Sequence, residues 1–472
     1  MLTPVFPASP PVRLRGEESF LLPPPVLAAL ERLWAAGFEA WIVGGCVRDL
    51  LLGRTPTDYD LTTSARPEQT KAVFAGERVL ETGIRHGTVT VLGEGMPLEI
   101  TTYRVDGGYS DARHPDGVTF SASLREDAAR RDFTINAMAY APGRGIQDFF
   151  GGREDLARGL IRAVGDPRRR FQEDALRVLR GLRFASVLSF SLEEETADAA
   201  RRQAEGLGQL SAERVFQELS KLLCGPAVGL VLLAYPDILG QVIPELRPMV
   251  GFDQRSRYHC YDVYTHTAVA VAYVPPRLPL RLAMLLHDVG KPETFSLGED
   301  GQGHFYGHAK RSAALAEEIL VRLRTPKKLR EEVVTLVRLH DAPVAPEGLR
   351  RWLNKLGPDG LFDLLALQGG DAAGQDSAYC TRIWQAEDLA RQVRDLLDQQ
   401  PCLTLRDLAV DGRDLLALGY RGPALGAALQ KLLDQVLAGA LPNEKGGLLQ
   451  WLRENDAKKP ESKKIKKSAK TC

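Results

Sequence analysis

The fold is decided by residues 41–60, which read WIVGGCVRDLLLGRTPTDYD. An apolar run ends at Gly44-Gly45, a helical pattern follows, and a Gly/Pro loop leads to Asp58 and Asp60. A strand that ends in two glycines and feeds a helix N-terminus presents backbone N–H groups that suit phosphate. We expect both aspartates on one strand, where residues two apart share a face and can hold a divalent metal. The pattern predicts nucleotidyl transfer, although a DxD also marks nucleotide-sugar glycosyltransferases.

Length and composition bound the class of protein. The 472 residues are too many for one core, so two to four domains are expected. Lys plus Arg and Asp plus Glu number 61 each, so net charge does not indicate a nucleic-acid partner. The six cysteines form no CxxC pair, which argues against a zinc ribbon or a secreted disulfide scaffold. No membrane-length apolar run or signal-peptide core occurs, which favours a cytoplasmic protein without a membrane partner.

Short segments bounded by glycines dominate the first third of the chain. After Gly152 the pattern is helical almost to the end, with Pro/Gly breaks. The expected fold class is α+β, a small mixed α/β head followed by an elongated all-α body. In the head we expect a helix at 26–36 and strands at 40–43, 59–62, 88–92 and 98–102.

A third carboxylate and a pair of arginines extend the first motif. Glu99 lies in PLEITTY, an expected strand, and a third carboxylate on a neighbouring strand fits a two-metal site. It would bind one metal or draw the proton from an attacking hydroxyl. Arg130 and Arg131 could grip a triphosphate through bidentate bonds. A lone DxD is more often a solvated turn, so the inference depends on these additional residues.

The segment 173–184 reads EDALRVLRGLRF and is expected to be one helix. Asp174 and Arg177 would be adjacent there and could lie in one plane with a base. An Asp accepts from an exocyclic amine and an Arg donates to a ring nitrogen, so the pair would accept C and A and reject U and G. The alternative is a salt-bridged surface row.

At these residues the sequence resembles the bacterial class II tRNA nucleotidyltransferases, the CCA-adding enzymes. The motifs that carry the resemblance occur in family order and are GGCVRDLLLG, TDYDLTT, TGIRHGTVTV, EITTYR, RRDFTINAMAY, DFFGGREDL, EDALRVLRGLRFA and SAERVFQELSKLL. The resemblance implies a polymerase-beta-like head and stepwise addition of C, C and A to the tRNA 3′ end. CTP and ATP would be the substrates, and the helical body would grip the tRNA acceptor arm through backbone and shape.

The resemblance also implies site residues. The catalytic residues would be Asp58, Asp60 and Glu99, and Asp58 and Asp60 would also bind Mg²⁺. The nucleotide phosphates would contact Gly45, Arg48 and Arg131. The base would be selected by Asp174 and Arg177, with Arg180 and Arg183 nearby.

Members of the family differ in product. Some add CCA, some only CC, some only A, and a relative makes poly(A). Residues 104–120 resemble the flexible loop of full CCA enzymes, which CC-adding members lack. Full CCA addition is therefore the hypothesis, with an A-adding specialist left open.

A second constellation follows in the helical body. The run LLHDVGKP at 285–292 resembles the HD phosphohydrolase superfamily. The resemblance implies that His266, His287, Asp288 and Asp341 ligate a second divalent metal, with His308 a weaker candidate. Metal-activated water would then attack a phosphate ester, as in phosphatases and 2′,3′-cyclic phosphodiesterases. The alternatives are a degenerate scaffold, or an HD site that is the main activity.

Together these patterns divide the chain into six ranges. The Lys-rich tail is expected to be disordered, with a weak contact to RNA backbone as the alternative. The ranges are a Pro-rich lead-in at 1–24, the nucleotidyltransferase head at 25–150, a helical neck and RNA-binding domain at 151–250, an HD domain at 251–375, a C-terminal helical tRNA-binding region at 376–455 and the basic tail at 456–472.

Overall fold

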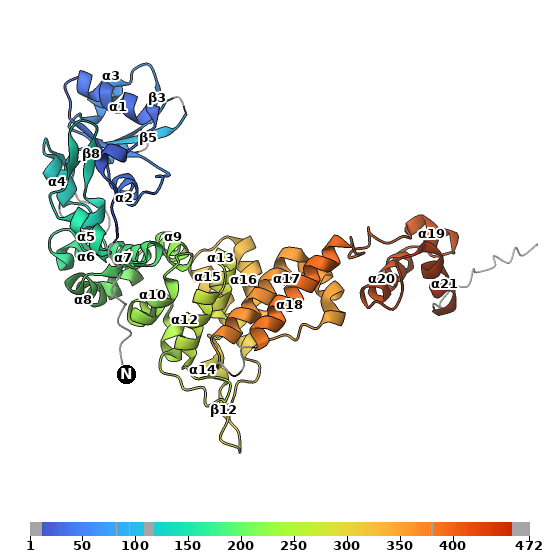
Figure 1. Ribbon diagram of the computed structural model, residues 1–472. Helices are drawn as coiled ribbons and strands as arrows, with labels where there is room; N and C mark the ends of the chain where they lie inside the picture. Colours follow the sequence, from blue (N-terminus) through green and yellow to red (C-terminus); the bar gives the residue numbers. More distant parts are fainter. Residues whose placement is uncertain are drawn as a thin grey trace, which may run out of the picture.

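The computed structural model of the protein describes residues 12–455 except 82, 94, 108–117, 377 and 379–380. The described chain is elongated (Figure 1). The α/β head lies at one end, drawn in blue, and helices continue from it to the red C-terminal helices at the other end. This confirms the expected class, an α/β head followed by a helical body. The lead-in before residue 12 and the basic tail at 456–472 lie outside the described residues.

One mixed sheet forms the centre of the head. Its strand order is β3-β4-β5-β2-β1-β8-β9. Strand β2 pairs antiparallel with β1 and parallel with β5, which places β2 inside the sheet. The seven strands are β1 (Ala40–Val43), β2 (Asp60–Thr63), β3 (Arg78–Leu80), β4 (Thr88–Leu92), β5 (Pro97–Thr102), β8 (Ala139–Ala141) and β9 (Gly145–Gln147).

Strand β2 begins one residue later than expected, and this changes the position of Asp58. Val43, the last residue of β1, lies opposite Asp60, the first residue of β2. The chain then turns away at Gly44, so residues before Asp60 have no β1 partner. Asp60 is therefore on the strand, whereas Asp58 lies in the loop that precedes it. The prediction of both aspartates on one strand is wrong for Asp58.

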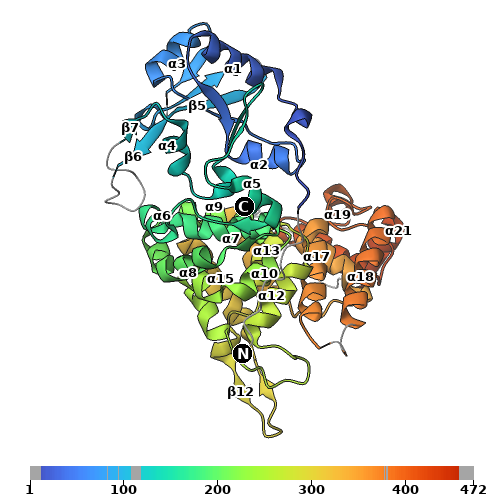
Figure 2. The ribbon, with the colours of Figure 1, turned by 60° about the vertical axis from the view of Figure 1, so that its left-hand side comes forward.

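Four helices cover the head sheet. Helices α1 and α3 lie on the side away from the body, and α2 and α4 lie nearer the body (Figure 2). A separate pair, β6 (Arg104–Asp106) and β7 (Val118–Phe120), flanks residues 108–117, so most of the loop compared with full CCA enzymes lies outside the described residues. The helices are α1 (Pro24–Ala35), α2 (Gly45–Leu51), α3 (Pro67–Val73) and α4 (Leu124–Ala129).

The body is a run of packed helices with three short strand pairings. The helices are α5 (Gly152–Arg158), α6 (Pro167–Glu173), α7 (Leu176–Leu188), α8 (Glu194–Gln203), α9 (Ala212–Leu223), α10 (Val228–Ala234), α11 (Pro236–Val242), α12 (Val263–Tyr273), α13 (Leu278–Leu286), α14 (Lys291–Thr294), α15 (His308–Arg322), α16 (Lys327–Leu339), α17 (Leu349–Ala373), α18 (Thr381–Asp398), α19 (Gly412–Ala417), α20 (Pro423–Leu437) and α21 (Lys445–Asn455). The small strands are β10 (Leu160–Ile161) with β11 (Ser191–Leu192), and β12 (Ser296–Leu297) with β13 (Gly303–His304); Phe133 and Ala163 form an isolated bridge.

The buried apolar side chains of the head and body form one large cluster and smaller ones beside it. One buried cluster runs without a break from Val26 in the head to Leu367 in α17. Helix α18 packs on α17 through Leu361 and Val393, while a separate cluster begins at Cys402 and contains the last three helices. Burial of apolar side chains thus joins head, neck and the 251–375 segment into one packed unit, and the C-terminal helices have a core of their own.

In the described part of the chain, no single helix has both the length and the apolar composition to cross a membrane. Helices α9 and α10, bent by 119°, pass that test only as a pair, on length and composition alone.

Candidate active site

The junction of β1 and α2 has the geometry of a phosphate cradle. Gly44 has φ +81°, a conformation that L side chains rarely adopt. A Cβ there would also lie 3.1 Å from Nη1 of Arg131. The chain enters α2 at Gly45, and Arg48 on the first turns donates to Oδ1 of Asn136 at 2.8 Å. Glycine is thus required where the backbone turns toward the arginines.

A cavity of about 320 Å³ opens beside this junction. Of the predicted residues it gathers Gly45, Arg48, Asp58, Asp60, Arg131, Arg180 and Arg183. Glu99, Asp174 and Arg177 are not among its lining residues. The cavity is also lined by Gly44 of the predicted cradle and by Cys46, Asp49, Thr57, Asp132, Asn136 and Phe184.

The three head carboxylates approach each other from a loop and two strands. Asp60 on β2 lies directly opposite Glu99 on β5 in the parallel register. Burial raises the pKa of Asp60, and the negative charge of Asp58 raises it further, against the lowering effect of Arg131. Burial and the charges of Asp60 and Asp58 likewise raise the pKa of Glu99. Carboxylates that repel one another fit a divalent cation, which relieves the repulsion.

Arginines balance these acids on the other side of the cavity. Arg131 is held by Asp127, whose Oδ2 lies 3.4 Å from Nη2. Asp127 is buried on α4 and also binds Arg130 at 2.8 Å. Asp127 therefore fixes the direction of both arginines. Sequence reasoning missed it, and the spacing of three and four residues from an acid to two arginines was the signal available.

An ion pair joins the head to the neck across the cavity. Arg180 on α7 donates through Nε and Nη2 to Oδ2 of Asp132 at 2.9 and 2.5 Å. Burial opposes ionisation of Asp132, but Arg180 outweighs it and lowers the pKa to about 2. The next arginine of α7, Arg183, pairs with Glu218 of α9 at 2.9 Å. Asp132 of the head thus positions Arg180, and Glu218 of α9 positions Arg183.

The predicted helix 173–184 is broken, and this corrects the placement of Asp174. Helix α6 ends at Glu173, Asp174 is extended with φ −147° and ψ 105°, and α7 begins at Leu176. The break is stabilised because Asp174 accepts a bond from the Leu176 N–H at 3.0 Å, as acidic residues do at helix starts.

Asp174 and Arg177 each have other partners. Arg214 of α9 donates to Asp174 at 2.9 Å. Arg177 donates to Glu173 at 2.8 Å and to the carbonyl of Arg130 at 3.2 Å. The two residues are near in sequence and belong to the same junction of α6, α7 and α9.

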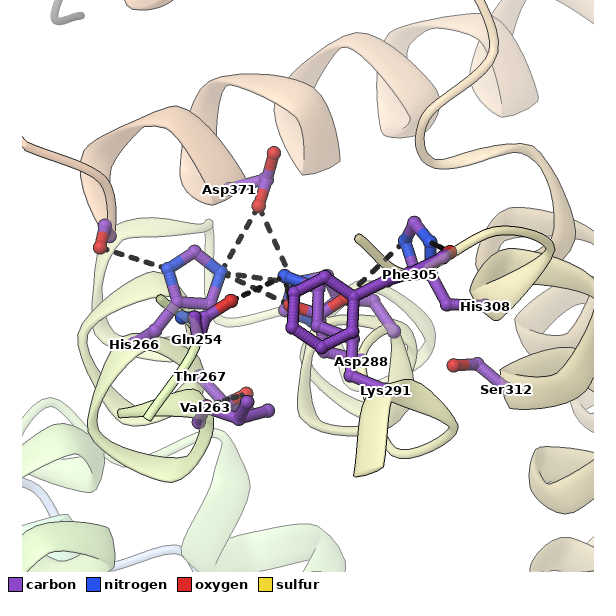
Figure 3. A network of polar contacts seen from close by, with 12 residues as sticks. Gln254, Val263, His266, Thr267, Asp288, Lys291, Phe305, His308, Ser312 and Asp371 are labelled. Atoms are coloured by element: carbon purple, nitrogen blue, oxygen red, sulfur yellow. Dashed lines mark hydrogen bonds and ion pairs between the residues drawn. The ribbon is translucent and has the colours of Figure 1, made fainter. Parts of the chain in front are cut away.

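A second polar centre lies in the body, where four side chains converge (Figure 3). His266 Nε2 lies 3.1 Å from Oδ1 of Asp371 and 3.2 Å from Nε2 of His287. His287 Nε2 lies 3.1 Å from Oδ2 of Asp288. The ligand atoms of all four residues fall within 4.8 Å of one another, the geometry of a metal-binding group.

The fourth member of this group corrects the sequence-based assignment. The structure brings His266, His287 and Asp288 together as expected, but the carboxylate beside them belongs to Asp371 of α17. Asp341 is exposed and only lines the adjacent cavity of about 730 Å³. The preceding residue, His340, is buried, so α16 turns the histidine inward and leaves Asp341 at the rim.

Further histidines occupy the same cavity. His308 Nε2 lies 3.1 Å from Nε2 of His340, and these atoms form a second group with Asp288. Buried carboxylates outweigh the effect of burial and raise the pKa of His287, whereas burial and the charge of His287 lower the pKa of His340 to about 4. Burial also lowers the pKa of His259 to about 3, and His259 lies against His266 with ring centroids 5.1 Å apart.

Comparison with known proteins assigns the family. A "Poly A polymerase head domain" model matches residues 40–162, "Probable RNA and SrmB- binding site of polymerase A" matches 189–249, and "tRNA nucleotidyltransferase domain 2" matches 305–452. A CCA-adding enzyme of Lactobacillus helveticus is 36% identical over 93% of this chain and 98% of its own length. The chain belongs to the CCA-adding enzyme family. A CCA-adding enzyme of Geobacillus stearothermophilus is also 36% identical, over 91% of this chain and 96% of its own.

Solved structures of the family agree with this fold. The crystal structure of the Bacillus stearothermophilus CCA-adding enzyme in complex with CTP aligns with TM-score 0.69 and 31% identity, over 92% of this chain and 98% of that one. Residues 250–304, which contain His266 and His287-Asp288, lie between the second and third matched family models.

Proposed function

We propose that this protein adds C, C and A in turn to the 3′ end of tRNA, using CTP and ATP and releasing pyrophosphate. The observation that carries the proposal is the single cavity that combines the Gly44-Gly45 cradle, Asp58 and Asp60, and the arginines of α2 and α7. The relatives named above are CCA-adding enzymes, and they align with almost the whole length of this chain. Full CCA addition is therefore favoured over the A-adding, CC-adding and poly(A)-making alternatives.

In the proposed reaction the 3′ hydroxyl oxygen of the tRNA bonds to the α-phosphorus of the nucleotide. The bond from that phosphorus to the bridging oxygen breaks, and pyrophosphate leaves with the electron pair. Asp58 and Asp60 would hold Mg²⁺, which when bound would supply charge neutralisation for the triphosphate and the hydroxyl. Arg48 and Arg131 bind phosphate oxygens, and Glu99 accepts the hydroxyl proton, a role consistent with its raised pKa.

Base selection is proposed for Asp174 and Arg177. Asp174 accepts from the exocyclic amine of C or A, and Arg177 donates to the adjacent ring nitrogen. Both side chains already hold protein partners, Arg214 and Glu173, so a bound base must replace or share these bonds. Discrimination then arises because U and G present a carbonyl beside an N–H, which does not match the acceptor of Asp174 and the donor of Arg177.

The body is proposed to hold the acceptor arm of tRNA through backbone and shape. This activity implies a cytoplasmic location, where tRNA and the nucleotides are found. The test is incorporation of labelled CTP and ATP into three tRNAs that end before the first C, before the second C and before A, with Mg²⁺ present. Sequenced products ending in CCA from all three are expected. Incorporation of neither nucleotide overturns the proposal, and A alone from the last tRNA assigns an A-adding specialist.

A second candidate function is favoured by the group of His266, His287, Asp288 and Asp371. We propose that this centre binds a divalent metal and hydrolyses phosphate esters, with water adding to phosphorus and the alcohol leaving with a proton. A bound metal would supply activation of the water and neutralisation of the phosphate. Alcohol and phosphate release from a phosphomonoester should be lost in His287→Ala and retained in Asp60→Asn. If hydrolysis occurs with none of Mg²⁺, Mn²⁺, Co²⁺ and Ni²⁺, this centre is a scaffold without hydrolase activity.

A further inference from the structure

We propose that Phe184 is a positioning residue of the nucleotide cavity, whose ring holds the guanidinium groups of Arg48 and Arg183 toward the triphosphate. The ring acts through these two arginines and touches no reacting atom. The proposal rests on the nucleotide transfer proposed above. It adds a residue to that site and names the part of the substrate that this residue controls, which is the phosphates and not the base.

Phe184 differs in kind from the rest of the cavity wall. It lies on α7 directly after Arg183 and is 6% exposed. Among the described residues that line the cavity, it is the only aromatic one, and the others are glycines or carry a polar, thiol or charged group. An apolar ring gains nothing from direct contact with a triphosphate. Its place in an anion site therefore calls for another partner.

Guanidinium groups are that partner. Cζ of Arg183 lies over the ring of Phe184, 3.9 Å from its centroid. The corresponding distances are 5.3 Å for Arg48 and 5.8 Å for Arg180. A cation within about 6 Å of the centroid is attracted by the negative charge of the ring face. Since Arg48 belongs to α2 of the head and the other two belong to α7 of the neck, one ring contacts cations from both parts of the chain.

These arginines repel one another, and the ring opposes the repulsion. Burial lowers the pKa of Arg183, an effect that Glu218 opposes. The charges of Arg180 and Arg48 lower this pKa further, as like charges close together do. Glu218 binds Arg183 at 2.9 Å, and Asp49 binds Arg48 at 2.8 Å. An acid holds a guanidinium but cancels its charge, whereas an aromatic ring attracts it and leaves the charge in place for an anion.

The ring is oriented in turn by the head. Phe133, which is fully buried, packs edge-on against Phe184, with ring centroids 5.8 Å apart and an angle of 81° between the planes. Gly181 of α7 permits this approach, because a Cβ there would lie 3.2 Å from Cζ of Phe133. The edge of one buried ring thus sets the direction of the ring face that the arginines contact.

The location of the arginines indicates which part of the nucleotide Phe184 controls. Arg48 and Arg183 line the cavity that contains the Gly44-Gly45 cradle, proposed for the phosphates. Asp174 and Arg177, proposed for base selection, are not among the described residues of its lining. The phosphates are the same in CTP, ATP and UTP. Loss of the ring should therefore weaken the binding of every nucleotide by a similar factor and leave the choice of base unchanged.

The experiment measures ligand binding to the full chain by equilibrium dialysis, with Mg²⁺ and without tRNA. The probes are CTP and inorganic triphosphate, which carries the phosphates without a base. Phe184→Leu keeps an apolar side chain but removes the aromatic face, and it should raise the Kd of both probes about tenfold. Phe184→Tyr keeps the face and should stay within about threefold of the wild-type Kd. Unchanged binding in Phe184→Leu, or equal losses in both variants, would overturn the proposal.

Phe74→Leu is the matched control. Arg32 lies over the ring of Phe74 at 4.4 Å, and Phe74 is 2% exposed and outside the described lining of the cavity. Thermal melts should show that this variant and Phe184→Leu are both folded and both less stable than the wild type. Phe74→Leu should nevertheless bind both probes as the wild type does. Equal weakening of binding in the two variants would assign the effect to general destabilisation and overturn the proposal.

The choice of base supplies a second readout. The ratio of kcat/KM for CTP over UTP should be the same in Phe184→Leu as in the wild type, and a fall in this ratio would overturn the assignment of Phe184 to the phosphates. The proposed function fails separately. If the two probes bind as expected but no nucleotide is added to tRNA, the proposed transfer is rejected while the role of Phe184 in triphosphate binding stands.

Discussion

Arg180 of α7 donates through two nitrogens to a single oxygen of Asp132, so the neck helix is tied to the head at the wall of the nucleotide cavity. Asp132 is 8% exposed and Arg180 is also paired with Glu218 at 3.8 Å. The pair therefore fixes how the helix that carries the arginines meets the cradle.

Asp132→Asn should destabilise the protein at pH 7. The pKa of Asp132 is lowered from 3.8 to about 2, which corresponds to about 2 kcal/mol of stability for the charged form. Because the folded-state pKa is depressed, this stability is present above pH 4 and is lost as the pH falls toward 2. Urea unfolding at several pH values measures it. Glu154→Gln, in an exposed pair with Arg158, should change the unfolding free energy by less than about 0.5 kcal/mol.

Gly44→Ala should lower both stability and nucleotide transfer. The positive φ costs about 1–2 kcal/mol for an L residue, and the new Cβ displaces Arg131. Gly37→Ala is the matched control, since its φ is +84° but a Cβ there meets nothing within 4 Å. Both variants should lose similar unfolding free energy, whereas only Gly44→Ala should raise the KM for CTP and ATP. Equal KM values in the two variants would contradict a role of the Gly44-Gly45 cradle in binding the nucleotide.

Asp60→Asn should abolish transfer without unfolding the protein. Burial and Asp58 raise the pKa of Asp60, so its charged form is unfavourable in the folded state near neutral pH. Removing the charge should leave the melting temperature unchanged or higher, while single-turnover transfer falls by at least about a thousandfold. Substantial transfer in this variant would exclude Asp60 as a metal ligand.

Asp174→Ala should loosen the choice of base. The ratio of kcat/KM for CTP over UTP should fall by about tenfold to a hundredfold, because one base-reading bond is worth about 1–3 kcal/mol. Arg214→Ala removes the partner of Asp174 but leaves the carboxylate, so this variant should keep most of the discrimination. An unchanged ratio in Asp174→Ala would show that Asp174 does not select the base.

The local sequence pattern predicted the ends of a strand well where glycines delimit it and a neighbouring strand supplies its hydrogen-bond partners. Strands 40–43 and 88–92 are confirmed at both ends, and the neighbouring positions of Asp60 and Glu99 follow from the strand pairing. Asp174 was misplaced because a helical pattern does not reveal that its backbone is extended and that its side chain accepts a bond from the Leu176 N–H between two helices. Asp371 was missed because it lies on α17, in a segment without a local motif, and only tertiary packing brings it to His266.

The separate core of α19, α20 and α21 has a consequence for the size of the substrate. The cradle and these helices stand at opposite ends of the chain (Figure 1). We expect that an acceptor arm bound along the body, as proposed above, must span the distance between the cradle and these helices to touch both. If the proposed acceptor arm contacts both ends, shortening it by a few base pairs should break one contact or withdraw the 3′ end from Asp60, whatever the sequence of the RNA.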